Sequence, residues 1–357
     1  MTALIFLIVL AILIFVHELG HFLAARACGI RVDAFALGFG PRLISWRRKE
    51  TEYALNAIPF GGYVKIFGEN PNEESLNGPH SHRSFVNKPR WQQAVVLVAG
   101  VFFNFIFAAL LYIIVFSVGV TATTSGFEKH ADRFENQRIM VTYVAPGSPA
   151  ETAGLKTGDV LTTSESIESV QDMIHESGGK PISIAYVRDE VAQTSMVTPV
   201  TGIVADKYAI GISMDTVGTL QLPVGTAITE GFAYTWGMMK LTVIGLWDFF
   251  GSIFKGAADF ASVTGPIGIA GIVGDAADLG FTYLLMITAL ISINLGVINL
   301  IPFPALDGGR LLFVIIEACI RRRIPMSFAN AVNLVGFSLL MLLMVVVTYK
   351  DIVKMFW

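Results

Sequence analysis

Three side chains in the stretch FVHELGHFLA, residues 15–24, could carry out hydrolytic chemistry. His17 and His21 are four residues apart, so on a helix both imidazoles lie on one face and can bind the same metal ion. Glu18 would lie beside the open coordination position, where its carboxylate can take a proton from a bound water. The spacing predicts the helix of a metal-dependent peptidase. A structural metal site, or a buried polar network, is the alternative.

A catalytic zinc site needs a third protein ligand, and the segment NLIPFPALDGG, residues 299–309, holds the best candidate. Asp307 is an isolated carboxylate in apolar surroundings, which is costly unless a cation neutralises it. Pro302 and Pro304 should end the preceding helix, and we expect 308–309, both glycine, to form a tight turn. Alternatively, Asp307 is a loop carboxylate that caps the following helix.

The elements that must position these residues have the composition of membrane spans. The chain is 54% hydrophobic and 15% charged, too apolar for an ordinary water-soluble domain. A spanning helix needs about 20 apolar residues, and four stretches qualify: 1–27, 92–119, 281–302 and 333–349. A cleaved signal peptide is disfavoured at the start, because the positively charged beginning is missing and the apolar run continues to residue 27. Ionisable residues inside a span usually face a functional cavity.

The distribution of Lys and Arg predicts the orientation of the spans. Basic residues are concentrated between the first two spans and again at 321–323, before the fourth span. Both connections are therefore predicted to be cytoplasmic. The acid-rich middle segment, about 121–226, is predicted to lie on the other side with both termini. The active site should then open toward the cytoplasm.

The first cytoplasmic connection is predicted to form strands. VDAFALGFGPRLISW and EYALNAIPFGGYVKIFG show strand and turn patterns and are too apolar to lie freely in water. We expect them to lie against the membrane or dip into it, beside protein or a wet cavity. Residues 35–39 and 63–67 could bind an unwound substrate as an added strand. In the polar loop 69–90, we expect no metal role for His80 or His82.

The middle segment contains YVAPGSPAETAGLKTGDVL, residues 143–161, which predicts a strand, a turn, a short helix and another strand. This pattern resembles a PDZ domain, in which a peptide is bound as an added strand beside a helix. A spacer or size filter without a ligand is the alternative. Residues 222–255 form an aromatic amphipathic stretch, interrupted by Lys240 and Asp248. We interpret it as an interfacial helix rather than a fifth span.

Taken together, HELGH, the GVFFN of the second span, the PDZ signature and NLIPFPALDGG resemble the site-2 protease family of intramembrane zinc metallopeptidases. Members that act as bacterial regulators of sigma-E carry two tandem PDZ domains, whereas one signature is present here. The resemblance implies that His17, His21 and Asp307 hold Zn²⁺ and that Glu18 is the catalytic base. It also implies that Asn299 and Asn294 hold the substrate backbone, with hydrogen bonding between helices as the alternative.

The predicted fold class is a polytopic α-helical membrane protein with four transmembrane helices, membrane-associated β-strands and an extracytoplasmic PDZ (α+β) domain. The expected divisions are 1–119 for the first catalytic half, 120–221 for the PDZ domain, 222–279 for the interfacial segment and 280–357 for the second catalytic half. Asn104, four residues after Gly100, is expected to help pack the second span against the first. Cys28 and Cys319 are predicted to be buried thiols.

The resemblance implies single-span membrane proteins as substrates, such as an anti-sigma factor or a remnant signal peptide, and a location in the lipid bilayer of the bacterial inner membrane. The net charge of −3 is close to neutral and says little about partners, but nucleic acid is not an expected one, because no basic cluster with interleaved aromatics is present. A zinc transporter and a non-enzymatic PDZ scaffold are the competing interpretations. The register of Glu18 between the histidines favours hydrolysis.

Overall fold

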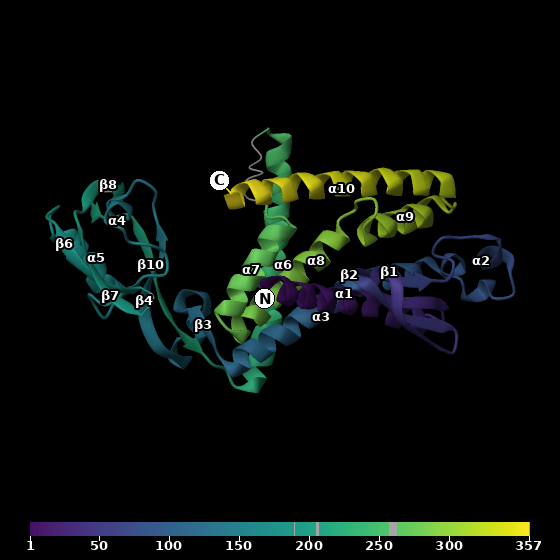
Figure 1. Cartoon of the computed structure of the whole chain (residues 1–357), viewed down its shortest axis with the longest axis horizontal. Helices are drawn as coiled ribbons and strands as arrows, with labels where there is room; N and C mark the ends of the chain where they lie inside the picture. Colours follow the sequence, from purple (N-terminus) through teal and green to yellow (C-terminus); the bar gives the residue numbers. More distant parts are fainter. Residues whose placement is uncertain (189, 205–206, 257–262, 357) are drawn as a thin grey trace. The chain divides into compact units, whose positions relative to one another are not determined.

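The computed structural model describes residues 1–188, 190–204, 207–256 and 263–356. The chain forms two compact units, Met1–Val115 with Gly225–Trp357, and Phe116–Val224. The helices of the first unit and the sheets of the second are traced in Figure 1.

Four helices in the described part of the chain are long and apolar enough to cross a membrane, judged by length and composition. They are α1 (Thr2–Ala27), α3 (Arg90–Val118), α8 (Phe281–Leu300) and α10 (Met326–Phe356). The prediction of four long apolar helices is confirmed. The fourth begins earlier than residue 333, directly after Pro325, because the helix continues through polar residues at both ends of the apolar stretch.

The first unit also contains shorter helices and one further long helix: α2 (Glu73–Asn77), α6 (Val224–Phe254), α7 (Pro266–Asp278) and α9 (Asp307–Ile320). In Figure 1, α6 runs from top to bottom, whereas α1 and α10 run from side to side. It is not among the four candidate spans. Its placement in the membrane interface stays a prediction.

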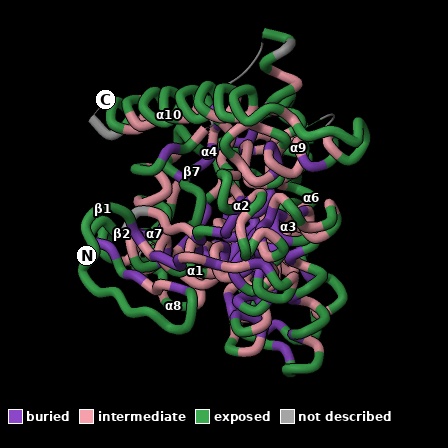
Figure 2. The backbone as a smooth tube through the Cα atoms, turned by 90° about the vertical axis from the view of Figure 1, so that its right-hand side faces the viewer, coloured by how far each residue is buried: buried purple, intermediate pink, exposed green. Residues whose placement is uncertain are grey.

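Helices α1 and α3 cross closely at two glycines. A Cβ atom on Gly20 would overlap the carbonyl of Ala99, and one on Gly100 would overlap the ring of His21. In the most apolar 18-residue stretch of α3, 50% of the residues are buried, compared with 6% in that of α10. In Figure 2, α10 is exposed along nearly its whole length, whereas buried segments gather around α3. Helix α3 is therefore the centre of the first unit, and α10 is peripheral.

Between α1 and α3, the strands β1 (Val32–Arg48) and β2 (Thr51–Ile66) form a sheet that folds back on itself. Phe35 is paired with both Val64 and Tyr53, so two segments of β2 flank the first half of β1. The second half of β1, residues 42–48, pairs with residues 51–56. Segment 62–66 therefore forms one edge of the sheet and 42–48 the other. The strands predicted for this region are present.

The second unit contains a six-stranded antiparallel sheet in the order β3-β10-β4-β5-β6-β7, and β8 pairs separately with β9. The strands are β3 (Val120–Thr123), β4 (Phe134–Val144), β5 (Val160–Leu161), β6 (Ile182–Arg188), β7 (Val191–Val197), β8 (Val200–Val204), β9 (Lys207–Ala209) and β10 (Ile212–Leu220). The strand, short helix and strand predicted for 143–161 are present as β4, α4 (Pro149–Thr152) and β5. Helix α5 (Ile167–Glu176) contributes Val170 and Ile174 to the apolar core of this unit.

The burial of the two cysteines agrees only in part with the prediction. Cys28 is partly buried at the end of α1, but Cys319 is exposed. The buried residues of α9 are Gly308, Gly309 and Val314, all in its first eight residues, whereas Cys319 lies in the exposed last turn of the helix. The prediction of two buried thiols is wrong for Cys319.

Candidate metal centre

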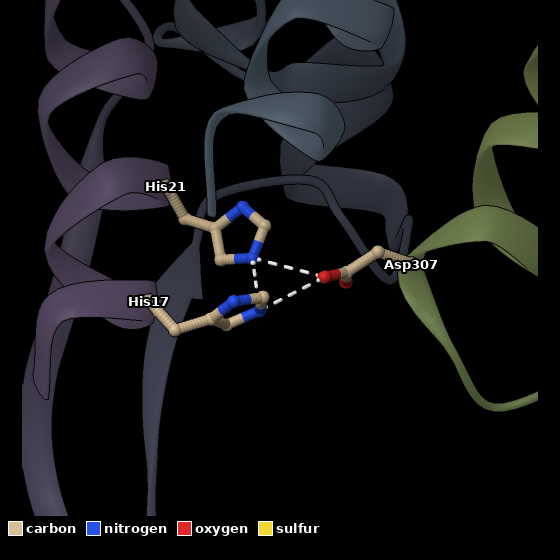
Figure 3. A group of neighbouring side chains, drawn as sticks. All are labelled: His17, His21 and Asp307. Atoms are coloured by element: carbon tan, nitrogen blue, oxygen red, sulfur yellow. Dashed lines mark hydrogen bonds and ion pairs between the residues drawn. The ribbon is translucent and has the colours of Figure 1, made fainter. Parts of the chain in front are cut away.

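The two histidines of α1 meet the first residue of α9. The Nε2 atoms of His17 and His21 are 3.1 Å apart, and Asp307 Oδ2 lies 3.0 Å and 3.2 Å from them, respectively. Figure 3 shows both imidazoles turned toward the Asp307 carboxylate. Among the described residues, these three form the group of ligand-type side chains that could hold a metal ion, and His80 and His82 are not part of it. The structure thus brings together the three predicted ligands.

The hydrogen bonding of His21 indicates that the space between His17, His21 and Asp307 suits a cation. Its Nδ1 lies 2.8 Å from the carbonyl oxygen of Val96, which can only accept a hydrogen bond. In a neutral His21, Nδ1 therefore carries the hydrogen and Nε2 presents a lone pair to Asp307. A carboxylate also presents only lone pairs, so a cation between them would relieve their repulsion. Four ligands at the zinc distances of about 2.0–2.1 Å would lie about 3.3 Å apart, close to the spacing observed. The three residues therefore fit zinc.

Asn104 of α3 supports the other imidazole. Its side chain is fully buried, and its amide group contacts His17 Nδ1, with a distance of 3.1 Å from Nδ2. Its Oδ1 has no hydrogen-bond partner in the described part of the chain. The oxygen and nitrogen of an amide are assigned rather than observed, and turning the amide would let Oδ1 accept from His17 Nδ1–H. That tautomer frees His17 Nε2 for a metal ion, as a hydrogen bond to the other ring nitrogen commonly does.

The sequence predicts only a packing role for Asn104, and its contact with His17 is not foreseen. Asn104 and Gly100 are four residues apart on α3, so both face α1. Gly100 lets the rings lie directly against the backbone of α3, because a Cβ atom there would come within 2.8 Å of His17 Cε1 and closer still to His21. The shared helix face was the signal that could have connected both residues to the metal centre.

Asp307 reaches the imidazoles because α8 ends at Leu300 and a short loop returns the chain into α9. The left-handed turn of that loop is at Ala305, with φ 73°, and its N–H donates to Asn333 Oδ1 over 3.2 Å. The prediction of a glycine turn is wrong. Gly308 and Gly309 are helical, and each lies so close to loop carbonyls that a Cβ atom would overlap them. No side chain caps the start of α9, which also contradicts a capping role for Asp307.

Glu18 lines the same cavity as the three predicted ligands. This cavity has a volume of about 220 Å³ and is lined by His17, Glu18, His21, Tyr63, Val64, Ile66, Glu69, Leu97, Asp307 and Arg310. A Cβ atom on Gly62 would lie 3.5 Å from Glu18 Cγ, so the edge segment 62–66 of the sheet lies directly beside this carboxylate. The arrangement can therefore place a proton acceptor, a cation site and an open strand edge around one substrate.

Glu69 and Arg310, which both line this cavity, form an ion pair with each other. Neither Glu69 nor Arg310 is a candidate site residue from the sequence alone. Arg310 follows Asp307 by three residues and so lies near it on α9, but nothing in the sequence pairs it with Glu69, which lies 241 residues away. The pair connects the segment after β2 to α9, the helix that begins with Asp307.

The two asparagines of α8 lie elsewhere. Neither Asn294 nor Asn299 is among the described residues that line the cavity. Asn294 Oδ1 accepts a hydrogen bond of 2.9 Å from Thr242 Oγ1 of α6, which is the hydrogen bonding between helices that the sequence left open. Asn299 is partly buried, near the end of α8. Their roles in substrate binding stay predictions.

Comparison with known proteins identifies the family. The model of peptidase family M50 matches residues 5–343, nearly the whole chain. This chain belongs to peptidase family M50. The membership confirms the resemblance to the site-2 protease family, and the chain is accordingly a membrane protease.

Three curated relatives are similar to this chain over most of their length. A protein of Clostridium perfringens, provisionally named a zinc metalloprotease, is 37% identical over 97% of each chain. A protein of Campylobacter jejuni with the same kind of name is 33% identical, covering 97% of this chain and 91% of the relative. The zinc metalloprotease RasP of Shouchella clausii is 29% identical over 99% of both chains.

Proposed function

We propose that this chain is an intramembrane zinc protease that hydrolyses peptide bonds within the spans of single-pass membrane proteins. The observation that carries the proposal is the convergence of His17, His21 and Asp307 in one cavity with Glu18. Both histidines and Glu18 belong to a helix with the composition of a membrane span. The zinc-metalloprotease names of the relatives support zinc as the metal.

Each residue of the site has a separate task. When bound by His17, His21 and Asp307, zinc supplies Lewis acidity and lowers the pKa of water to about 7. Glu18 takes the proton of the attacking water and returns a proton to the leaving amine. Val96 and Asn104 orient the two rings from α3, so that both Nε2 atoms face Asp307.

The edge of the sheet supports a mode of substrate binding. A peptide bond inside a helix is shielded, so the substrate must unwind before it can be cut. Segment 62–66 pairs with β1 on one side, and an extended substrate can pair with the opposite side as an added strand. Because Gly62 and Tyr63 lie beside Glu18 and the ligands, such a strand enters the cavity next to the proton acceptor.

The substrates we propose are an anti-sigma factor or a remnant signal peptide in the bacterial inner membrane. The cavity would open toward the cytoplasm, and the second unit would lie outside as a PDZ domain that binds a peptide or excludes bulky substrates. The strand, helix and strand order of β4, α4 and β5 supports the PDZ assignment. The basic connection between α1 and α3 supports the orientation.

The test is elemental analysis of the purified full chain, combined with cleavage of a model single-span substrate in vesicles. Glu18→Gln should keep the zinc content of the wild type and lose activity on the order of 10³-fold, since the general base is removed. His17→Ala should lose both. Glu168→Gln, an exposed change on α5, is the matched control and should retain both.

Normal cleavage by Glu18→Gln would show that another group is the base. Zinc uptake into the same vesicles, without any cleavage of the substrate by the wild type, would favour the competing transporter.

A further inference from the structure

We propose that the junction between α1 and the β1–β2 sheet binds one anionic phospholipid, with its phosphate at the Lys49 turn and an acyl chain in the adjoining groove. This site is separate from the metal centre, and its occupation does not depend on peptide hydrolysis.

The head-group part of the site is a basic pocket. Its volume is about 160 Å³, and it is lined by Arg26, Arg48, Lys49, Glu50, Thr51 and Tyr53. Arg26 belongs to the last turn of α1, and the other residues surround the turn between β1 and β2. The end of α1 and the turn between β1 and β2 thus both supply cationic side chains to one pocket.

The positive charge of this pocket is not neutralised by the protein. In the described part of the chain, no carboxylate lies within ion-pair distance of Arg26, Arg48 or Lys49. Glu50 is already engaged, because Arg83 donates to both of its oxygens over 2.7 Å and 2.5 Å. These hydrogen bonds hold the pKa of Glu50 below its usual range and keep it ionised and paired. Three cations therefore remain for an external anion.

The backbone conformation of the turn between β1 and β2 supports a function for the charge of Lys49. Arg48 pairs with Thr51, so Lys49 and Glu50 form a two-residue connection. Lys49 has a φ of 56°, a left-handed conformation that Gly or Asn adopts more easily. A lysine at this position places its side chain in the pocket despite the less favourable backbone.

An apolar groove continues from the basic pocket, and Tyr53 lines both. The groove has a volume of about 410 Å³ and is lined by Phe15, Leu19, Phe22, Phe35, Leu37, Ile44, Trp46, Tyr53, Ala54 and Leu55. The Tyr53 ring stacks on Trp46 with centroids 5.6 Å apart, and its hydroxyl makes no hydrogen bond to any described residue. Tyr53 can therefore contact an acyl chain with its ring and a phosphate with its hydroxyl.

The order of side chains along α1 matches the order of groups in a phospholipid. Phe15, Leu19, Phe22 and Arg26 follow one another at intervals of three or four residues, so they lie on one helix face. The rise from the first to the last is about 16 Å, and the face changes from aromatic to cationic along it. The acyl chain would lie along the aromatic part and the phosphate at the arginine.

The outer edge of the sheet makes lipid the occupant rather than a soluble anion. Leu43, Ile44 and Trp46 are 64%, 60% and 56% exposed, so these apolar side chains require hydrocarbon rather than water around them. A free phosphate would occupy only the basic pocket and leave the adjoining groove empty. A phospholipid fills both with one molecule.

The experiment counts lipids that remain bound to the full chain after extraction from vesicles of mixed phosphatidylglycerol and phosphatidylcholine. Native mass spectrometry of the wild type should show one retained phosphatidylglycerol. In the double variant Arg48→Gln/Lys49→Gln, the affinity for phosphatidylglycerol should be about thirtyfold lower. Each cation near a membrane surface strengthens the binding of anionic lipid several-fold. Arg47→Gln/Arg322→Gln removes the same charge from exposed positions outside the pocket and should retain the lipid normally.

The groove is tested by Ile44→Asp, which places a carboxylate on its exposed wall and should abolish retention of the lipid. Thermal unfolding of this variant checks that the chain is folded. Equal losses in both charge variants would show diffuse attraction to the membrane and overturn the proposal. Displacement of the lipid by millimolar inorganic phosphate, or retention of phosphatidylcholine equal to that of phosphatidylglycerol, would overturn it as well.

Discussion

Each unit contains a largely buried aspartate, Asp159 in the second unit and Asp307 in the first, and the two carboxylates have different kinds of partners. The side chain of Asp159, in the second unit, is 1% exposed and receives hydrogen bonds of 2.7 Å from Arg188 Nε and Nη2, and of 2.8 Å from the Lys156 N–H. The side chain of Asp307 is 20% exposed, and its polar contacts in the described part of the chain are the two imidazoles. The carboxylate of Asp159 is therefore fully paired by residues of its own unit, whereas that of Asp307 contacts, among the described polar groups, only the two imidazoles and would be completed by a bound cation.

The same substitution should therefore have opposite effects at the two positions. Asp307→Asn should lose zinc and at least about 10³-fold of the activity, because one ligand is gone and no general base can act without the metal centre. The unfolding of the second unit should be unchanged. Elemental analysis and cleavage of the single-span substrate measure the first effect, and limited proteolysis in urea measures the second.

Asp159→Asn should leave the zinc content unchanged and lower the free energy of unfolding of the second unit by about 3 kcal/mol, because Arg188 loses a charged partner at a buried position. Zinc loss in this variant would mean that Asp159 also supports the metal centre, and the contrast between the two carboxylates would fail.

Gly100→Ala should have the next largest effect. Its new Cβ atom would push against the rings of His17 and His21, and a displacement of about 1 Å at a reacting centre can reduce activity about 10²-fold. Gly271→Ala, on α7, is the matched control because no atom lies within 4 Å of its added Cβ. The control should keep wild-type activity. Equal activities in the two variants would contradict the close contact of α3 with the rings.

Asn104→Ala should weaken zinc binding or activity about 10-fold to 100-fold, as is typical when a hydrogen-bond partner of a metal ligand is lost. Asn104→Asp should recover much of that loss, because its carboxylate can still accept from His17 Nδ1–H. Competition with a fluorescent zinc chelator measures the affinity. If Asp fails to restore what Ala loses, the ring hydrogen does not point to Asn104.

The smallest effect should come from Glu69→Gln. Its partner Arg310 has a side chain that is 38% exposed, and such pairs contribute about 1 kcal/mol or less. We expect KM to change about threefold with the zinc content unaffected. A double-mutant cycle with Arg310→Gln measures the coupling, and a coupling as large as that of Asp159 with Arg188 would contradict this ranking.

The parts of the site that could be predicted from the sequence depend on local geometry. His17 and His21 share a face because an α-helix repeats every 3.6 residues, and the four long apolar helices follow from hydropathy. Such reasoning fails where packing decides the outcome. The loop before α9 turns at Ala305 rather than at Gly308 or Gly309, because both glycines are needed for close contact with the loop carbonyls.

The metal centre and the lipid site illustrate the division between sequence and tertiary structure. Residue types and local spacing predicted two metal ligands, a general base and a candidate third ligand, since these predictions follow from helix periodicity and the cost of burying charge. Only the tertiary structure brought Asp307 to within 3.0 Å of His17 across 290 residues, placed Asn104 on its ring and joined two cavities at Tyr53. The crossing points of helices depend on close contacts such as Gly20 against Ala99, and side-chain packing between distant segments has no local periodicity.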